Sequence, residues 1–273
     1  MKTYLKILAA LAGVAFLFLA TSYALYVREH PIGCSDTLTL TGKITFQTFV
    51  DARKCLVRWT APKKTVVVEA SEGGDNAAAL ALGILIHRHG WDVEIVDYCA
   101  SACASFIFPA GKTIYLNRQS LLLFHGAPSQ ENLMEMAESF VPESPTNPAP
   151  AEPVTLGQVN KENTVSMVPK TAAYREVHEF LAIADSASPL ENLRAQRQAS
   201  EQLYRELGIN PLLPTYGQLG EYEKSYKSYK LLGFIYPLDS LRRLGMRNIE
   251  LKEGEWHPER HPAYKDVYEV TYP

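Results

Sequence analysis

The stretch of sequence that decides the fold is residues 98–128, which read YCASACASFIFPAGKTIYLNRQSLLLFHGAP. The preceding residues 91–98 contain alternating apolar side chains and predict a strand that ends near Tyr98. A turn of small residues follows, and it carries Ser101 in front of a second apolar run. His125 closes the next strand-like run. This order allows a hydroxyl nucleophile and a base to meet where the strands end.

Ser101 is predicted to lie at the N-terminus of a helix. At such an end the backbone N–H groups of Ala102 and Cys103 point outward, and the helix dipole favours a negative charge such as an acyl-transfer oxyanion. The alternative is that Ser101 is an ordinary helix N-cap. The residue types around it are compatible with both roles.

A pair of glycines lies upstream of this stretch. Residues 65–71 predict a buried strand, residues 72–74 a turn, and residues 75–89 a helix rich in Ala and Leu. Gly73 and Gly74 allow backbone amides to approach a substrate, because glycine has no side chain and tolerates positive φ. A plain turn from strand to helix is the alternative.

Strands and helices alternate over the whole N-terminal half. Residues 37–41 alternate as a strand and residues 46–57 are helix-like, ahead of the units described above. The alternation predicts α/β layers with right-handed crossovers.

The ordered set of motifs resembles the ClpP/crotonase superfamily. Within it, the chain is most similar to periplasmic or membrane-anchored proteins that resemble the proteolytic subunit of the Clp protease. The resemblance covers residues 37–128 and returns at 230–249. It implies a layered β/α core with Ser101 as the nucleophile and His125 as the base. It also implies an oxyanion hole formed by backbone amides, those of Gly73, Gly74 and Ala102.

The sequence departs from this family at the third member of the triad. The family has an aspartate two residues before a phenylalanine, and the matching position here is Leu232, ahead of Phe234. A leucine cannot orient an imidazole. The remaining readings are a Ser–His dyad, a carboxylate from elsewhere, or a scaffold that no longer cleaves peptides. Asp239 is predicted to stabilise the N-terminus of a helix.

Composition limits the size of the core and the class of partner. The 273 residues, 47% of them hydrophobic and 21% charged, suffice for one domain of about 200 residues with appendages. A net charge of −3 without a dense Lys/Arg block argues against nucleic acid as the main partner. We divide the chain into a membrane segment, a first part of the core, a Pro-rich insertion, C-terminal helices that complete the core and a polar tail, at residues 1–28, 29–128, 129–189, 190–252 and 253–273.

The N-terminus predicts a membrane anchor. Residues 7–27 contain no charged side chain and follow a short start with Lys2 and Lys6. Twenty-one residues in a helix can cross a hydrocarbon core of about 30 Å. The two lysines then keep the N-terminus in the cytoplasm and place the domain in the periplasm or outside, on a single-pass inner-membrane anchor. A signal peptide cleaved after residues 22–24 is the alternative.

Export gives the four cysteines a role. In an oxidising compartment we expect Cys34 to pair with Cys55 and Cys99 with Cys103. The second pair brackets Ser101, so a disulfide there would fix the turn. The alternative is that Cys99 and Cys103 are two buried free thiols. No metal site is predicted, because no second Cys pair or suitable His pair accompanies these cysteines. The histidines of the motif at 257–261 are expected in a solvated loop.

Two functions are compatible with the sequence. The first is a membrane-anchored serine peptidase-like hydrolase that acts on peptides or proteins outside the cytoplasm without a cofactor. The second is a non-catalytic envelope protein that uses the same fold for binding or assembly. An acyl-CoA enzyme is disfavoured, because an exported site has no ready supply of CoA. The expected partners are the substrate, the membrane and a second copy of the chain. The apolar face of the predicted helix at 190–207 is expected to serve core packing or a subunit contact.

Overall fold

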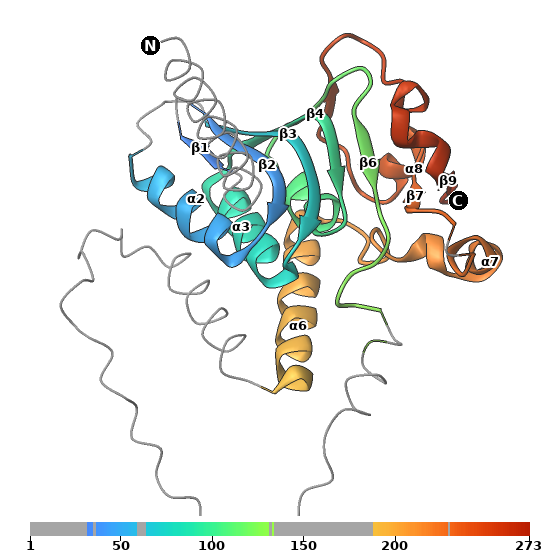
Figure 1. The fold of residues 1–273 in the computed structure, drawn as a ribbon, viewed down its shortest axis with the longest axis horizontal. Helices are drawn as coiled ribbons and strands as arrows, with labels where there is room; N and C mark the ends of the chain where they lie inside the picture. Colours follow the sequence, from blue (N-terminus) through green and yellow to red (C-terminus); the bar gives the residue numbers. More distant parts are fainter. Residues whose placement is uncertain (1–31, 35–36, 59–63, 131–132, 134–187, 229) are drawn as a thin grey trace, which may run out of the picture.

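The computed structural model describes residues 32–34, 37–58, 64–130, 133, 188–228 and 230–273 (Figure 1). The predicted anchor at 7–27 and the five-proline run at 142–153 lie outside these residues. Within the described ranges, no helix is both long and apolar enough to span a bilayer.

The core is one large, mostly parallel sheet, which confirms the α/β class. Its order is β1-β2-β3-β4-β5-β8, and β6 also pairs with β4. Only β1 is antiparallel to its neighbour in this sheet. The strands are β1 (Ile32–Cys34), β2 (Leu38–Ile44), β3 (Thr65–Gly74), β4 (Asp92–Ala100), β5 (Ile114–Leu116), β6 (Leu121–Leu123) and β8 (Ile249–Leu251).

Strand β4 is shared between two partners. Its first half pairs with β5, through Val93 to Ile95, and its last three residues pair with β6, through Tyr98 to Ala100. The sheet therefore branches at β4, with β5 beside its first half and β6 beside its end; Figure 1 shows β6 next to β4. This split places the end of β6 directly beside the end of β4.

Among the described residues, the helices α2 (Phe46–Arg58) and α3 (Asn76–His89) pack against strands of this sheet, and α6 (Pro189–Leu207) packs on α3. Helix α3 contacts both of the others. It begins where the Asp75 carboxylate accepts the N–H of Ala78, and it ends at Gly90 in the left-handed conformation. Its residues 78–86 are all buried, as expected for a helix enclosed on every side.

Helix α6 packs into the core, as its apolar face predicts. Ser188 and Glu191 form a capping box at its start. Leu203 and Tyr204 are buried, and Leu203 lies beside Gly83 of α3. A methyl group on Gly83 would come 2.3 Å from the Phe106 carbonyl, so a glycine is needed for this close helix packing.

A second, small sheet joins β7 (Gly233–Ile235) to β9 (Val267–Glu269) in parallel. Phe124, just after β6, bridges Phe234 of β7 with two backbone hydrogen bonds of 2.8 Å. Helix α8 (Leu238–Arg243) follows β7, and Asp239 in its first turn pairs with Arg242 at 3.3 Å. The C-terminal part of the chain therefore packs directly against the strand that leads to His125.

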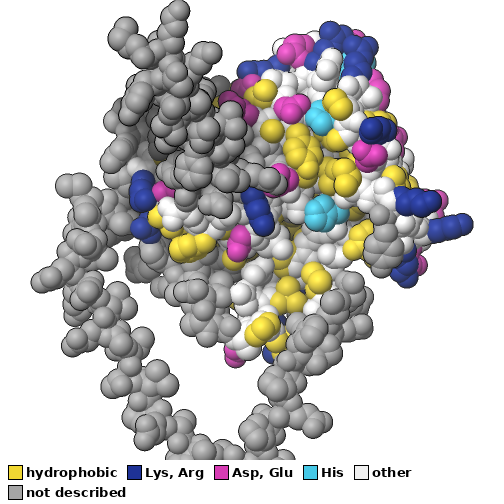
Figure 2. Space-filling model, viewed as in Figure 1, with side chains coloured by type: hydrophobic (Ala, Val, Ile, Leu, Met, Phe, Trp, Pro, Cys, Tyr) yellow, Lys and Arg dark blue, Asp and Glu magenta, His cyan; other side chains and the backbone are white. Residues whose placement is uncertain are grey.

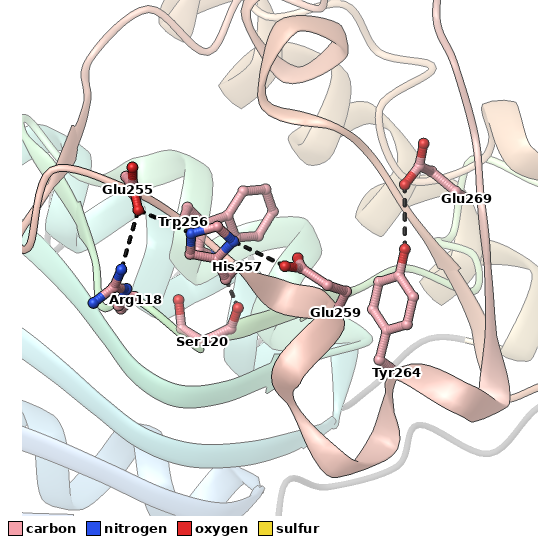
Figure 3. Close-up of polar contacts among 8 residues, drawn as sticks. All are labelled: Arg118, Ser120, Glu255, Trp256, His257, Glu259, Tyr264 and Glu269. Carbon is pink, nitrogen blue, oxygen red and sulfur yellow. Dashed lines mark hydrogen bonds and ion pairs between the residues drawn. The ribbon is translucent and has the colours of Figure 1, made fainter.

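The C-terminal residues 253–273 are not the polar tail that the sequence predicts. They supply β9, and Val270 is fully buried. Figure 3 shows how the segment is fastened to the loop before β6. The Trp256 indole donates to the Ser120 carbonyl at 2.7 Å, and the His257 N–H donates to the Arg118 carbonyl at 2.6 Å.

The two histidines of this segment also differ from the prediction of a solvated loop. His257 lies between Glu255 and Glu259 at 3.0 and 2.8 Å (Figure 3). The side chain of His261 is 11% exposed and pairs with Asp97 at 3.2 Å. Periodicity in the local sequence does not predict these pairs. Asp97 is distant from His261 in the chain, and the two glutamates beside His257 lie in a segment without a repeating pattern.

Candidate functional site

Ser101 lies at a strained turn where β4 ends. Strand β4 extends past the predicted end at Tyr98 and reaches Ala100. Ser101 then has φ 57°, and it is the one non-glycine residue with positive φ among the described residues. Such a conformation costs about 1–2 kcal/mol and persists where the surroundings impose it. Here the Ser101 N–H donates to the Leu123 carbonyl, and its carbonyl accepts from the Ser105 N–H, both at 2.9 Å.

This geometry excludes the ordinary N-cap role. The N-cap of the following helix is Ala102, and no side chain caps that helix. The helix is a buried π-turn, η1 (Cys103–Ile107), followed by the 3-10 turn η2 (Phe108–Ala110). Isolated π-turns occur often at functional sites. The Ser101 side chain is partly exposed at the mouth of this turn.

A disulfide closes the turn around Ser101. Cys99 and Cys103 are bonded, with their Cα atoms 5.4 Å apart, and both are fully buried. The bond joins Cys99, the residue before the end of β4, to Cys103, the first residue of η1. It therefore restricts the three residues between them. Cys55 is also buried and disulfide-bonded. The side chain of its predicted partner, Cys34, lies outside the described part of the chain.

Gly73 and Gly74 belong to strand β3 and do not form the predicted turn. The strand continues because Gly74 pairs with Ile44 of β2. Gly73 has φ 81°, and a methyl group on it would lie 2.6 Å from the Ser101 Cβ and 2.8 Å from the Ala102 nitrogen. The absence of a side chain at Gly73 therefore makes room for the turn that carries Ser101. On Gly74 a methyl group would lie 2.2 Å from the Ile44 carbonyl oxygen.

The predicted oxyanion donors differ in their availability. Among the described residues, the Ala102 N–H has no hydrogen-bond partner. The Gly73 N–H donates to the buried Ser71 hydroxyl at 3.2 Å, and this hydroxyl donates to the Gly42 carbonyl at 2.8 Å. Sequence reasoning missed Ser71. Its only signal is a serine two residues before the first glycine.

His125 lies two residues beyond Leu123, at the end of the strand that pairs with β4. Because Ala100 is in register with Leu123, Ser101 and His125 extend from the same ends of adjacent parallel strands. The His125 side chain is exposed, and within the described residues no hydrogen bond joins it to Ser101. Catalytic hydrogen bonds are often loose without substrate and tighten when it binds. On the face seen in Figure 2, histidine side chains lie among hydrophobic ones, with most charged side chains at the margin.

The surroundings of His125 favour the neutral imidazole. Partial desolvation is the main influence and lowers its pKa below the usual value of 6.5, while an interaction with its own backbone opposes this shift. No described carboxylate contributes to the shift. The neutral imidazole, which is the form that can accept a proton, therefore persists to a lower pH than in an ordinary histidine.

This lowered pKa predicts the acid limb of any activity that uses His125 as a base. We expect the acid limb of kcat/KM to be centred below pH 6.5, because protonation of the imidazole removes the base. The measurement is kcat/KM of the free enzyme across pH 4.5–8, with the folded fraction followed at each pH. A limb centred above pH 7 would contradict the prediction.

The position expected for the third triad member holds a leucine that is 56% exposed. Leu232 donates its N–H to the Asp266 carbonyl at 2.7 Å. A methyl group on the next residue, Gly233, would lie 3.0 Å from the His125 Cβ, so this strand does run beside His125. The strand that follows Leu232 therefore runs beside His125, and Leu232 itself supplies no carboxylate.

Within the described residues, no group of three or more His, Cys, Asp or Glu side chains could hold a metal ion. No family model, curated protein or solved structure matches the chain.

Proposed function

We propose that this chain is a serine hydrolase of the ClpP/crotonase-like class that acts on peptides or proteins. The observation that carries the proposal is the strained Ser101 at the end of β4, next to the unpartnered Ala102 N–H. An ordinary structural serine has no need of a positive φ, whereas a nucleophile gains exposure from such a turn.

The proposed chemistry is acyl transfer in two steps. The Ser101 Oγ attacks the substrate carbonyl carbon while His125 takes its proton. The negatively charged oxygen of the intermediate then accepts a hydrogen bond from the Ala102 N–H. It also accepts one from the Gly73 N–H once that group no longer donates to the Ser71 hydroxyl. When this tetrahedral intermediate collapses, the bond from the carbonyl carbon to the amine breaks, and the amine takes the proton from His125. A water molecule, activated by the same imidazole, then releases the acyl group from Ser101.

We further propose that the domain lies outside the cytoplasm, attached through residues 7–27. The uncharged run after Lys2 and Lys6 supports this location. The Cys99–Cys103 disulfide supports it independently, because structural disulfides persist in oxidising compartments.

The proposal is tested by a fluorophosphonate probe, which reacts covalently with activated serines. We expect the full-length chain to be labelled at Ser101 and the Ser101→Ala variant to remain unlabelled. Ser228→Ala is the matched control, since Ser228 is exposed and lies outside the site. Peptide mapping identifies the labelled residue.

A folded parent chain without labelling would overturn the hydrolase proposal. The exposed Leu232 in the acid position favours a second candidate, a binding or assembly protein of the envelope built on the same fold. That candidate predicts no labelling and a tight complex with an envelope partner that Ser101→Ala leaves intact.

A further inference from the structure

A cavity of about 500 Å³ lies between helix α6, the segment that follows this helix and the loop after His125. Its volume is within the usual range for a binding site of a small ligand. Helix α6 forms one wall with four side chains at helical spacing, which are Arg197, Glu201, Tyr204 and Arg205. The segment at 209–215 and Ser129 complete the lining.

The cavity lies beside the candidate site. Ser129, in its lining, is four residues beyond His125 in the chain. The segment after α6 is linked to the same histidine. The Gln218 Nε2 donates to the His125 carbonyl at 2.9 Å, and the Gln218 N–H donates to the Thr215 carbonyl at 2.9 Å. A ligand in the cavity would therefore lie between two segments that both lead to His125.

Part of the lining is apolar. Ile209, Pro211 and Leu212 contribute to it, together with Tyr204. The Tyr204 hydroxyl already donates to the Ser105 carbonyl at 2.7 Å, so this residue offers a ligand its ring and not a hydrogen bond. Leu212 is 38% exposed, so its side chain is open to contact. Such a surface suits an apolar side chain of a ligand.

Three polar groups of the lining have no partner among the described residues. The Ser129 Oγ is buried without a hydrogen bond. Thr215 is only 7% exposed, and neither its hydroxyl nor the Arg205 guanidinium has a hydrogen bond or ion pair in the described part of the chain. A buried polar group without a partner is costly, so it marks a place where a water or a ligand atom belongs.

The charges of the lining favour an anion. The Arg197 Nε pairs with the Glu201 carboxylate at 3.1 Å, so these two charges offset each other. Arg205 is then the uncompensated cation of a cavity that also contains the Ser129 and Thr215 hydroxyls. A guanidinium and hydroxyl groups are donors that bind a carboxylate well. The cavity thus combines donors for one carboxylate with an apolar surface.

We propose that this cavity binds the C-terminal residue of a peptide, with the free carboxylate at Arg205 and an apolar side chain against Ile209, Pro211 and Leu212. A C-terminal apolar residue carries both groups on one carbon atom, which matches a cavity that offers both kinds of contact. The choice of a peptide as the ligand rests on the proposed function. It implies a hydrolase that selects substrates by their C-termini.

The test measures the binding of a fluorescent hexapeptide that ends in leucine, by anisotropy, to the full-length chain in detergent micelles. The Ser101→Ala chain is used, so that binding is measured without cleavage. We expect the free-acid peptide to bind saturably and the same peptide with a C-terminal amide to bind about tenfold more weakly, because the amide carries no charge for Arg205.

Two substitutions on α6 assign the carboxylate contact. Arg205→Gln should weaken binding of the acid peptide about tenfold and leave the amide peptide unchanged. Arg194→Gln is the matched control, because Arg194 is exposed on the same helix and lies outside the cavity lining. It should leave both affinities unchanged. Circular dichroism checks the fold of each variant.

Two further peptides identify the parts of the ligand that the cavity recognises. An amidated peptide with an internal glutamate carries its carboxylate on a side chain, and a free-acid peptide that ends in glycine lacks the apolar group. We expect both to bind about tenfold more weakly than the leucine acid. Leu212→Ser should reduce the preference for leucine over glycine, because it removes apolar surface from the lining.

The outcomes separate this inference from the proposed function. Equal binding of the acid and the amide, tighter binding of the glutamate peptide, or an unchanged affinity in a folded Arg205→Gln chain would overturn the inference even if Ser101 of the parent is labelled. If the parent is not labelled but the leucine acid binds through Arg205, the hydrolase proposal fails and the peptide site stands. If Arg205→Gln does not fold, Thr215→Val removes one hydroxyl at constant shape. Weaker binding of the acid alone in that variant supports the site, and no change overturns it.

Discussion

The Gly73→Ala variant should be labelled at Ser101 at least about 100-fold more slowly than the parent chain, because a displacement of about 1 Å at a catalytic group can lower a rate by that factor. The new methyl group would lie 2.5 Å from the Ala100 carbonyl and 2.6 Å from the Ser101 Cβ. The carbonyl oxygen belongs to the backbone and the Cβ is attached directly to it, so neither atom can rotate away without a backbone shift. The disulfide between Cys99 and Cys103 restricts the turn further. The turn must therefore shift as a unit.

The same substitution should lower the free energy of unfolding by about 3 kcal/mol. Positive φ for an L-residue accounts for about 1–2 kcal/mol of this loss, and overpacking adds about 1–3 kcal/mol. Gly254→Ala is the matched control, since Gly254 has φ 80° and no atom within 4 Å of an added methyl group. It should show the backbone cost alone and keep full labelling. Thermal unfolding and labelling are measured on both variants, and equal losses in the two would contradict the steric explanation.

Ser101→Ala and His125→Ala should each lower the rate of peptide hydrolysis by about 10⁴ or more, and the double variant should lose little beyond either one. The reason is that a serine without its base and an imidazole without its nucleophile both leave only the oxyanion contacts. Both side chains are at least partly exposed, so the fold should persist. The kcat/KM of all three variants is measured on an unfolded-protein or peptide substrate.

Additive losses in the double variant would show that the two residues do not act as a unit. His87→Ala is the control for the removal of a histidine, since His87 lies in the last turn of α3 and faces Glu206 at 3.7 Å. Full activity in Ser101→Ala would remove the serine mechanism altogether.

Burial does not explain why position 232 holds a leucine and not the acid that the family resemblance predicts. At 56% exposure, a carboxylate at this position would remain in contact with water and would not carry the desolvation cost of a buried charge. The leucine is therefore compatible with the fold without being required by it. The structure gives no packing reason for a leucine here.

Local sequence determined the class of the core. The apolar runs at 65–71 and 91–98 and the Ala/Leu-rich helix between them produce β3, β4 and α3, because hydrophobic periodicity and helix-cap residues act over a few residues. Their ends were less well predicted. β3 and β4 each run further than expected, since pairing with β2 and β6 supplies hydrogen bonds that the strand sequence alone does not show.

The site was only partly accessible to sequence reasoning. The small residues around Ser101 and the position of His125 are visible as motifs, but the positive φ of Ser101 depends on the Leu123 carbonyl of another strand. The Gly73 N–H donates to the Ser71 hydroxyl, and this hydroxyl is held in place by its own bond to the Gly42 carbonyl, 29 residues away in the chain. These features depend on atoms that only folding brings together.

The sequence by itself determined the alternation of strands and helices, the cysteines that bracket Ser101 and the leucine at the position where the family resemblance predicts an acid. Only the tertiary structure brought the side chain of Gln218, 93 residues away in the chain, to 2.9 Å from the His125 carbonyl. The neighbouring Gly217 packs so closely on the Phe234 ring that an added methyl group would lie 2.5 Å from it. It also decided that residues 253–273 are part of the fold. Long-range contacts of this kind carry no local periodicity, and so no pattern of neighbouring residues predicts them.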